Sequence, residues 1–222
     1  MLDNSKKNTN FVLLNDVISD AIIEMRYYYT YNFVGRRIDG YEEPYALLTE
    51  DAARALKKAS DYFISKGYRL KIYDAYRPER SVKQFINWTK DDNNAMKKYF
   101  YPNLEKPVLL EKGYIAKKSS HSRGSTVDIT LFDMNTGKEV DMGSTFDYFG
   151  EISHLDYMNI TKEQYQNRMI LKDTMVKNGF NTLDEEWWHF TLKDEPFKDT
   201  YFDFPINKNY KNNYIHIGGK HE

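Results

Sequence analysis

The sequence predicts an α+β fold in which helices flank a mixed or antiparallel sheet. Stretches with helical periodicity and stretches with strand-like alternation share the chain, without a regular strand–helix order. Clusters of Asn, Asp and Gly separate these stretches, as turns do. The chain has 222 residues, the length of one good-sized domain, so we expect residues 1–222 to form a single domain.

The first predicted elements are a strand at "AIIEMRY" and a long helix that begins after Thr49. Thr49 is a candidate N-cap, and Glu50 and Asp51 place carboxylates in the first turn, where they favour the helix dipole. Apolar side chains recur on one face of this helix, at Ala53, Leu56, Ala59, Tyr62 and Phe63. Gly67 is expected to end it.

A strand with alternating apolar and polar residues is predicted at 68–74, and Pro78 stops it. The next helix is predicted over 79–99, with a break at "KDDNN". Its inward-facing residues are Val82, Phe85, Ile86, Met96 and Tyr99. Two further strands are predicted at "STVDITLF" and "EVDMG".

The last predicted helix lies within "NITKEQYQNRMILKDTMVKNGF", where Thr161 and Gln164 form a capping box and Gly179 follows the end. Its apolar face includes Met169, Met175 and Val176. The final strand is "EEWWHFTL", because aromatic and β-branched residues favour a half-buried strand. Glu186 and His189 also lie in this strand, and their burial is costly unless each has a partner.

Composition excludes several classes of protein. The 32 Lys and Arg residues balance 33 Asp and Glu residues, so a nucleic-acid partner is not expected. The chain has no cysteine, so only His and carboxylate side chains could hold a metal. No apolar run is long enough for a membrane span, and the N-terminal residues lack the apolar segment of a secretory signal. We therefore expect a cytoplasmic protein; the alternative is an exported protein whose signal segment lies outside this sequence. The sequence leaves the oligomeric state open.

Three of the five histidines are expected to have no ligand role. His216 and His221 lie in a polar C-terminal stretch, where solvated side chains are the rule. His154 follows an acidic loop in "GEISHLDY", and a lone histidine is commonly packed or exposed without function. The two histidines that remain are His121 and His189.

His121 lies in "SSHSRGSTVDITL", and a strand that carries Asp128 begins a few residues later. Gly124 lets the chain bend between them, so the imidazole and the carboxylate can converge on one point. Two alternatives remain open for this stretch. His121 could be a surface loop residue, and Asp128 could form an ion pair with Arg123.

His121, Asp128 and His189 together make a set of two imidazoles and one carboxylate, which suits one catalytic Zn²⁺ per chain with a further position left to water. Glu186 is a spare carboxylate close to a ligand, and it is a candidate general base. Residues three apart on a regular strand point to opposite faces. We therefore expect a turn or bulge between Glu186 and His189.

The stretches "SSHSRGSTVDITL", "EWWHF" and "DAYRP" in combination resemble the zinc D-Ala-D-Ala dipeptidases of the vancomycin-resistance type, within the larger family of zinc D,D-carboxypeptidases and related peptidoglycan peptidases. With "MRYYYTYNFVGR" and "DMGSTFD", the resemblance extends over most of the chain. It implies a hedgehog/D,D-peptidase-like zinc site with His121, Asp128 and His189 as ligands. Glu186 is the catalytic base by the same resemblance.

The resemblance also implies that Arg77 of "DAYRP" steadies the developing oxyanion. On the sequence alone, an ordinary ion pair of Arg77 with Asp74 or Glu79 is the alternative. Members of the family often carry Ala at the position of Thr126, and Thr126 is expected to point away from Asp128 on the strand.

A free dipeptide has two charged ends, and the resemblance implies a partner for each. Asp147 is the candidate for the ammonium, and Ser119 and Tyr27 are candidates for the carboxylate. The alternatives are turn capping for Asp147 and Ser119 and core packing for Tyr27.

The leading hypothesis is therefore zinc-dependent hydrolysis of a small D,D-dipeptide, D-Ala-D-Ala, in cell-wall precursor metabolism or glycopeptide resistance. One alternative keeps the chemistry and changes the substrate: a D,D-carboxypeptidase that acts on peptidoglycan stem peptides. The other is a non-catalytic module that binds zinc or peptidoglycan.

Overall fold

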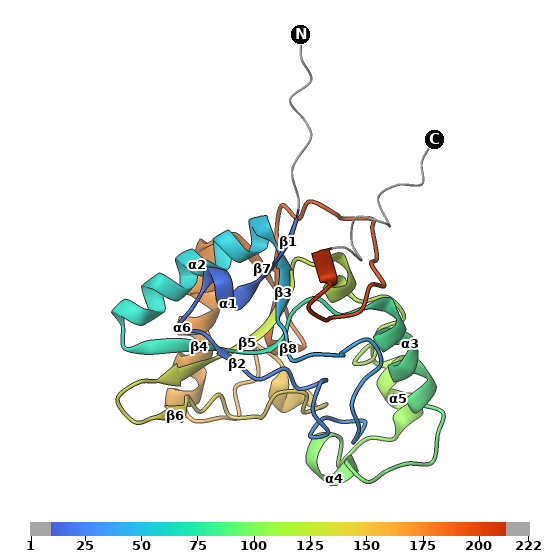
Figure 1. Ribbon diagram of the computed structural model, residues 1–222. Helices are drawn as coiled ribbons and strands as arrows, with labels where there is room; N and C mark the ends of the chain where they lie inside the picture. Colours follow the sequence, from blue (N-terminus) through green and yellow to red (C-terminus); the bar gives the residue numbers. More distant parts are fainter. Residues whose placement is uncertain (1–9, 212–222) are drawn as a thin grey trace.

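The computed structural model describes residues 10–211, and a mixed sheet lies at its centre (Figure 1). In this part of the chain, six strands pair in the order β2-β4-β5-β8-β7, with β6 paired to β5. β2 runs parallel to β4, whereas the pairs β4–β5, β5–β8 and β8–β7 are antiparallel. The strands are β1 (Phe11–Leu13), β2 (Ile22–Ile23), β3 (Leu47–Thr49), β4 (Tyr68–Asp74), β5 (Thr126–Asp133), β6 (Lys138–Glu139), β7 (Phe180–Leu183) and β8 (Glu186–Leu192). The predicted α+β class is confirmed.

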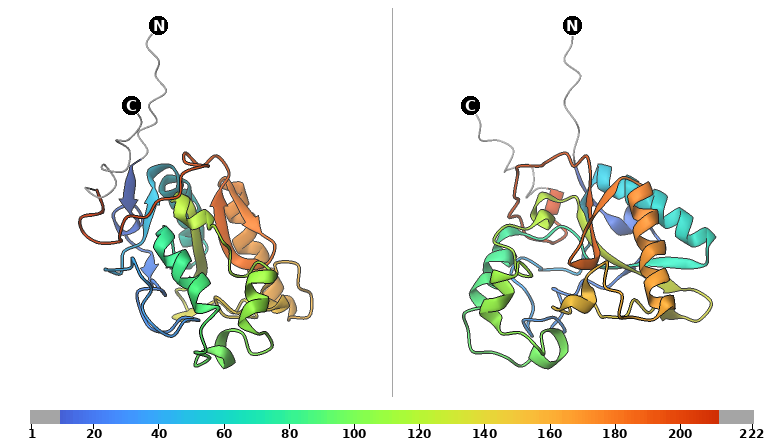
Figure 2. Two further views of the ribbon diagram at one scale, coloured as in Figure 1. Left: turned by 90° about the vertical axis from the view of Figure 1, so that its right-hand side faces the viewer. Right: turned by 180° about the vertical axis from the view of Figure 1, so that it is seen from behind.

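Two long helices pack on this sheet, and some shorter helices lie away from them. They are α1 (Leu14–Val17), α2 (Glu50–Ser65), α3 (Glu79–Trp88), α4 (Lys97–Phe100), α5 (Lys106–Glu111) and α6 (Lys162–Lys177), with 3₁₀ turns η1 (Ser120–Arg123) and η2 (Glu151–Ser153). α2 packs on β4 and α6 on β7, and the two helices lie side by side (Figure 1 and Figure 2). α3, α4 and α5 gather on the right-hand side of Figure 1, away from α2 and α6. Within residues 10–211, none of the helices is both long and apolar enough to cross a membrane.

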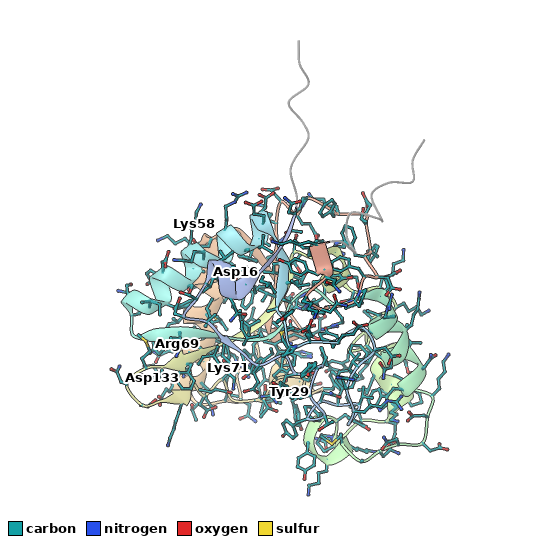
Figure 3. All side chains as sticks on the ribbon, in the orientation of Figure 1. Asp16, Tyr29, Lys58, Arg69, Lys71 and Asp133 are labelled. Carbon is teal, nitrogen blue, oxygen red and sulfur yellow. The ribbon has the colours of Figure 1, made fainter. Side chains whose placement is uncertain are left out.

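Charged side chains of both signs lie on one face of the molecule. Figure 3 labels Asp16 on α1, Lys58 on α2, Arg69 and Lys71 on β4, and Asp133 at the end of β5. Positive and negative side chains are therefore mixed on this face, as well as balanced in the overall composition.

The helix predicted after Thr49 is α2, and the strand predicted at 68–74 is β4, so both predictions are confirmed. Two details differ. The Thr49 side chain does not cap α2, because its Oγ1 lies 2.7 Å from Ser125 Oγ and links the helix start to the loop before β5. Tyr62 is 45% exposed, whereas the neighbouring Phe63 is buried, so only one of these adjacent residues can face the core.

The helix predicted over 79–99 ends at Trp88 in α3, and the predicted break is real. The Asp91 side chain accepts the Asn93 backbone N–H at 2.9 Å, a local bond that competes with helix formation. The inward position predicted for Tyr99 is wrong, because Tyr99 is 46% exposed and Phe100 takes the buried place in α4.

Two predicted strands are shorter in the structure. The strand predicted at 21–27 is reduced to β2, and the chain leaves the sheet before Tyr27. The strand predicted at 139–143 contributes only Glu139 to β6, because the Asp141 side chain accepts the Gly143 N–H at 2.8 Å and turns the chain. β5 and β8 match their predictions closely.

α6 has the predicted capping box. Thr161 Oγ1 accepts the Gln164 N–H at 3.2 Å, and Gln164 Oε1 accepts the Thr161 N–H at 2.9 Å. The apolar face is wrong at Val176, which is 48% exposed, whereas Arg168 is buried on the same helix. At Arg168, α6 packs against a polar loop and not against an apolar surface.

Replacing Thr161 with Ala is expected to lower the free energy of unfolding by about 1 kcal/mol, because the Gln164 N–H loses its acceptor. Urea unfolding monitored by circular dichroism measures this change. Lys162→Ala, at an exposed neighbouring position, is the control and should change the free energy by less than about 0.5 kcal/mol. Equal stability of Thr161→Ala and the wild type would contradict the capping role.

Candidate active site and metal centre

Three strands and one 3₁₀ turn bring the ionisable side chains of the site together. Asp128 on β5 lies opposite Asp74 on β4 and opposite His189 on β8. His121 arrives from η1, immediately before β5. Gly124 makes the bend between them with φ 80°, and a Cβ at this position would lie 2.3 Å from the ring of Phe11. The chain therefore requires glycine here, as the sequence indicates.

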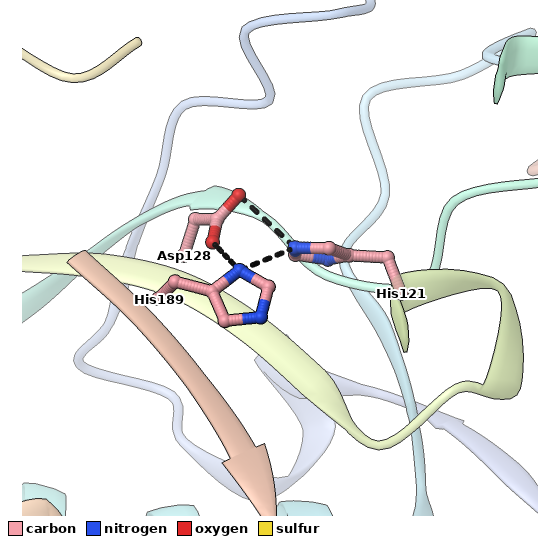
Figure 4. Close-up of side chains that lie close together, drawn as sticks. All are labelled: His121, Asp128 and His189. Carbon is pink, nitrogen blue, oxygen red and sulfur yellow. Dashed lines mark hydrogen bonds and ion pairs between the residues drawn. The ribbon is translucent and has the colours of Figure 1, made fainter. Parts of the chain in front are cut away.

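The predicted ligand set is brought together by this arrangement. His121 Nε2 and His189 Nδ1 are 3.3 Å apart, and each lies 3.2 Å from an oxygen of Asp128 (Figure 4). One ligand atom from each of the three residues falls within 4.8 Å of the others. Neither alternative for this stretch is seen, because His121 is 1% exposed and Arg123 pairs with Glu195 at 2.6 Å.

Each imidazole has a partner on its outer nitrogen. His121 Nδ1 lies 2.7 Å from the carbonyl oxygen of Ala75, which can only accept, so Nε2 is left with a free lone pair toward the cluster. His189 Nε2 lies 3.2 Å from Ser120 Oγ and 3.4 Å from Thr191 Oγ1. Such partners orient the rings of metal-binding histidines.

Thr126 does not point away from Asp128, and that expectation is wrong. Thr126 pairs with Thr191 across the sheet, with the two hydroxyl oxygens 2.9 Å apart, and Asp128 pairs with His189 two residues later. Residues two apart on a strand share a face. Thr126 therefore belongs to the hydroxyl groups behind His189.

The cluster meets the chemical requirements of a metal centre. Asp128 Oδ1 is buried and makes no hydrogen bond to the described residues, although it lies 3.2 Å from His189 Nδ1. Burial raises the pKa of Asp128, but the neighbouring imidazoles of His121 and His189 outweigh this effect and hold the pKa well below its usual value. A buried anionic carboxylate beside two converging imidazole nitrogens fits a divalent cation such as Zn²⁺.

The stretch from Glu186 to His189 is irregular, as the sequence predicts. Along β7 the pairing advances from Thr182 to Leu183, while along β8 it moves from Phe190 to Glu186. The extra residues of β8 bulge out of the ladder. Glu186 Oε2 consequently lies 3.5 Å from His189 Nδ1, on the same side as the cluster.

Glu186 has the electrostatic character of a base. Burial raises its pKa to about 7, and the charge of Asp128 adds to this effect, while His189 and Arg77 oppose it. A group with a pKa near neutrality is suited to accept and return a proton at that pH.

Arg77 makes the ion pair that the alternative interpretation predicted, but it also faces the site. Its Nε and Nη2 each lie 2.8 Å from Asp74 Oδ2, and Nη2 lies 3.5 Å from Asp128 Oδ2. The guanidinium carbon lies 4.9 Å from the ring centre of Tyr27. Asp74 is fully buried and accepts the Tyr41 hydroxyl at 2.6 Å, so Arg77 is held from behind.

A cavity of 340 Å³ opens beside the cluster, and all the predicted site residues line it. Asp147 is 5% exposed and accepts the Tyr27 hydroxyl at 2.9 Å. Burial raises the pKa of Asp147 well above its usual value, and the charge of Asp128 adds to this. The Tyr27 hydroxyl, a candidate for the substrate carboxylate, is thus paired with Asp147, the candidate for the ammonium. Ser119 Oγ accepts the His121 N–H at 3.3 Å, which is the predicted turn cap.

Asp147 has φ 61°, which places a non-glycine residue in the left-handed region. This conformation costs of order 1 kcal/mol and persists where the surroundings impose it. Its carboxylate therefore has a fixed position in the cavity wall.

Arg168, which no sequence pattern indicated, holds the loop behind this wall. Arg168 is 1% exposed on α6, and its guanidinium donates to the carbonyl oxygens of Met142, Ile152 and His154 at 2.6–2.8 Å. The loop that carries Asp147 is thereby tied to α6. Asp74, by contrast, lies within "DAYRP", and the sequence already indicated it as a possible ion-pair partner of Arg77.

Both tryptophans of β8, Trp187 and Trp188, are buried. Trp187 Nε1 donates to Ser144 Oγ at 2.8 Å, and the Trp188 ring packs 5.4 Å from that of Phe146. Both rings therefore support the loop that leads to Asp147. His154 is apart from the cluster, and its Nε2 lies 3.2 Å from the Tyr114 hydroxyl. His216 and His221 lie outside the described residues.

The chain is similar to known proteins over most of its length. The M15 peptidase family model described as D-ala-D-ala dipeptidase matches residues 7–207. The D-alanyl-D-alanine dipeptidase of Enterococcus faecium is 40% identical over 197 residues, 88% of this chain and 98% of that protein. The D-alanyl-D-alanine dipeptidase of Streptomyces coelicolor is 36% identical over 198 residues, 89% of this chain and 98% of that protein.

Among solved structures, a mutant of the vancomycin resistance D,D-pentapeptidase VanY from a VanB-type cassette, in complex with Zn(II), is 13% identical. It covers 70% of this chain and 78% of its own, with a TM-score of 0.40. The family of this chain follows from the sequence matches alone. Since the family model and these relatives span most of the sequence, the chain belongs to the D-Ala-D-Ala dipeptidase family of the M15 peptidases.

Proposed function

We propose that this protein hydrolyses the free dipeptide D-Ala-D-Ala with one bound Zn²⁺. The convergence of His121, Asp128 and His189, with Glu186 3.5 Å from His189, is the observation that carries the proposal. The relatives named D-alanyl-D-alanine dipeptidase support the substrate. A module that only bound zinc or peptidoglycan would not need Glu186 and Arg77 to line the same cavity.

Each residue of the site has a role in the proposed reaction. Bound zinc would act as a Lewis acid on the scissile carbonyl and would lower the pKa of a water molecule bound to the metal. Glu186 takes a proton from the attacking water and passes it to the nitrogen of the leaving D-alanine as the peptide C–N bond breaks. Arg77 donates to the carbonyl oxygen as negative charge develops there.

The two ends of the dipeptide have candidate partners in the cavity. Asp147 is proposed to hold the ammonium, and the Tyr27 hydroxyl, which the sequence assigned to the substrate carboxylate, is proposed instead to orient the Asp147 carboxylate. Burial raises the pKa of Asp147, and an ammonium beside it would favour the ionised form again. Ser119 is proposed to donate its hydroxyl to the substrate carboxylate.

One experiment tests the metal and the substrate together. The purified protein is analysed for metal and assayed with D-Ala-D-Ala, L-Ala-L-Ala and N-acetyl-D-Ala-D-Ala. We expect about one zinc per chain and turnover of D-Ala-D-Ala alone. Equal turnover of the acetylated peptide would favour the D,D-carboxypeptidase, and zinc binding without any hydrolysis would favour the non-catalytic module.

Arg77→Lys is expected to lower kcat for D-Ala-D-Ala about 100-fold with an unchanged zinc content, because Lys lacks the planar fork that can serve Asp74 and the substrate oxygen at once. Steady-state kinetics on the zinc-loaded variant measure the loss. Arg80→Lys is the control, because Arg80 pairs with Asp203 at an exposed position and should stay within about twofold of the wild type. If Arg77→Lys kept the wild-type kcat, the role of Arg77 would be purely structural.

We further propose a cytoplasmic location and a single domain over residues 1–222. The first follows from the substrate, since free D-Ala-D-Ala must be met before it enters the wall precursor. The second is supported by one continuous hydrophobic core from Phe11 to Tyr210. Cell fractionation tests the location, and a single cooperative unfolding transition tests the domain.

A further inference from the structure

A second cavity lies next to the candidate active site and shares part of its wall. It measures 410 Å³, and both Tyr114 and Phe149 line this cavity as well as the catalytic one. Its remaining wall includes 150–152 and Tyr148, which directly follows Asp147 in the chain. The shared wall therefore stands close to the carboxylate proposed to hold the substrate ammonium.

We propose that Tyr114 and Phe149 form a partition that restricts the site to free dipeptides, and that the second cavity is the space an amino-terminal extension of the peptide would need. The proposal rests on the proposed function, because it takes the substrate amine to lie at Asp147. It names specificity-determining residues and an unused subsite behind them.

Phe149 is the fixed part of the partition. Its side chain is 3% exposed, and its backbone N–H donates to the carbonyl oxygen of Phe100 at 2.7 Å. Its ring lies 5.1 Å from that of Phe33, which lines the catalytic cavity. Removing Phe149 would therefore disturb the core as well as the wall.

Tyr114 is the part that can be changed without opening the core. It is half-buried after the turn at Gly113, and its ring lies 5.7 Å from that of Phe149. The Tyr114 hydroxyl lies 3.2 Å from His154 Nε2, which holds the ring across the boundary. His154 is the histidine that the proposed metal centre leaves unused.

The backbone at His154, whose ring contacts the Tyr114 hydroxyl, is itself held by hydrogen bonds. Arg168 Nη1 donates to the carbonyl oxygen of His154 at 2.8 Å, and the next residue, Leu155, donates its N–H to the Asp184 carbonyl oxygen at 2.8 Å. Phe149 is thus held by burial and a backbone hydrogen bond, and Tyr114 by its contact with an anchored His154, so the partition opposes a longer substrate.

The second cavity has the chemistry of a peptide subsite. Leu104, Tyr148 and Tyr157 supply apolar and aromatic surface, and Lys112 and Glu151 add charges of opposite sign. An amino-acid residue placed before D-Ala-D-Ala brings its own atoms, an amide and an ammonium moved outward, and these groups can contact them.

The test compares the wild type with Tyr114→Ala on D-Ala-D-Ala and on Gly-D-Ala-D-Ala, whose hydrolysis gives Gly-D-Ala and D-alanine. The ratio of kcat/KM for the tripeptide over the dipeptide is expected to rise at least about tenfold in Tyr114→Ala. Tyr157→Ala is the matched control, because Tyr157 lines the second cavity but not the catalytic one. Its ratio should stay within about twofold of the wild type.

His154→Ala is the second variant, because it frees the Tyr114 hydroxyl and leaves the ring in place. Its ratio is expected to rise, but less than in Tyr114→Ala. The inference is overturned if both variants hydrolyse the dipeptide and neither gains on the tripeptide, or if the gain appears on the carboxyl-extended D-Ala-D-Ala-Gly instead. A wild type that does not cleave D-Ala-D-Ala would refute the proposed function itself, which separates the two failures.

Discussion

Glu186→Gln is expected to lower kcat for D-Ala-D-Ala about a thousandfold while the protein keeps its zinc. Gln has nearly the same shape as Glu but cannot accept a proton from the attacking water. The three proposed ligands are unchanged in this variant, because Glu186 lies beside His189 and is not part of the cluster. Loss of turnover without loss of metal therefore identifies a base.

Steady-state kinetics and metal analysis of the same preparation measure both quantities. Glu185→Gln is the matched control, because Glu185 is the adjacent carboxylate and is exposed. Its kcat should stay within about twofold of the wild type. If Glu186→Gln lost zinc in parallel with activity, Glu186 would be a ligand. If it kept wild-type turnover, the proton would be carried by another group.

Asp128→Asn is expected to weaken zinc binding by more than about a hundredfold and to abolish hydrolysis with it. Asp128 supplies the only carboxylate of the three-residue cluster, and the two imidazoles bind a metal in their neutral form. The variant keeps the size of the side chain and removes the charge. The remaining pair of imidazoles cannot compensate for the lost anionic ligand.

Competition with a chromophoric chelator measures the change in zinc affinity. Asp133→Asn is the control on the same strand, because Asp133 (Figure 3) is the last residue of β5, whereas Asp128 lies near its start. Its zinc affinity should match the wild type. A fully loaded Asp128→Asn protein would exclude Asp128 from the ligand set.

The elements with strong periodicity could be read from the sequence. α2, β4 and β5 lie where the pattern of apolar residues predicts them, and α6 begins at its predicted capping box. The errors occur where two neighbouring residues compete for one buried position, as at Tyr62 and Tyr99. They also occur where a side chain of a short turn takes the backbone hydrogen bond, as Asp141 does. Periodicity contains no information on either choice.

The candidate ligands and the base were visible because their chemistry requires particular residue types. With no cysteine in the chain, His and carboxylate side chains were the remaining ligands, and the motifs around His121 and His189 pointed to the family that the comparisons then showed. The irregular pairing of β8 was predictable for the same reason, since Glu186 and His189 cannot both face one point on a regular strand.

The sequence by itself thus determined the fold class, the ligand types and the need for a bulge at the Trp pair. Only the tertiary structure decided which groups surround them. Arg168 binds three carbonyl oxygens of a distant loop, and Tyr114 meets His154 and Phe149 across forty and thirty-five positions of chain. Such contacts depend on how the sheet and loops pack, because long-range partners leave no local pattern in the sequence.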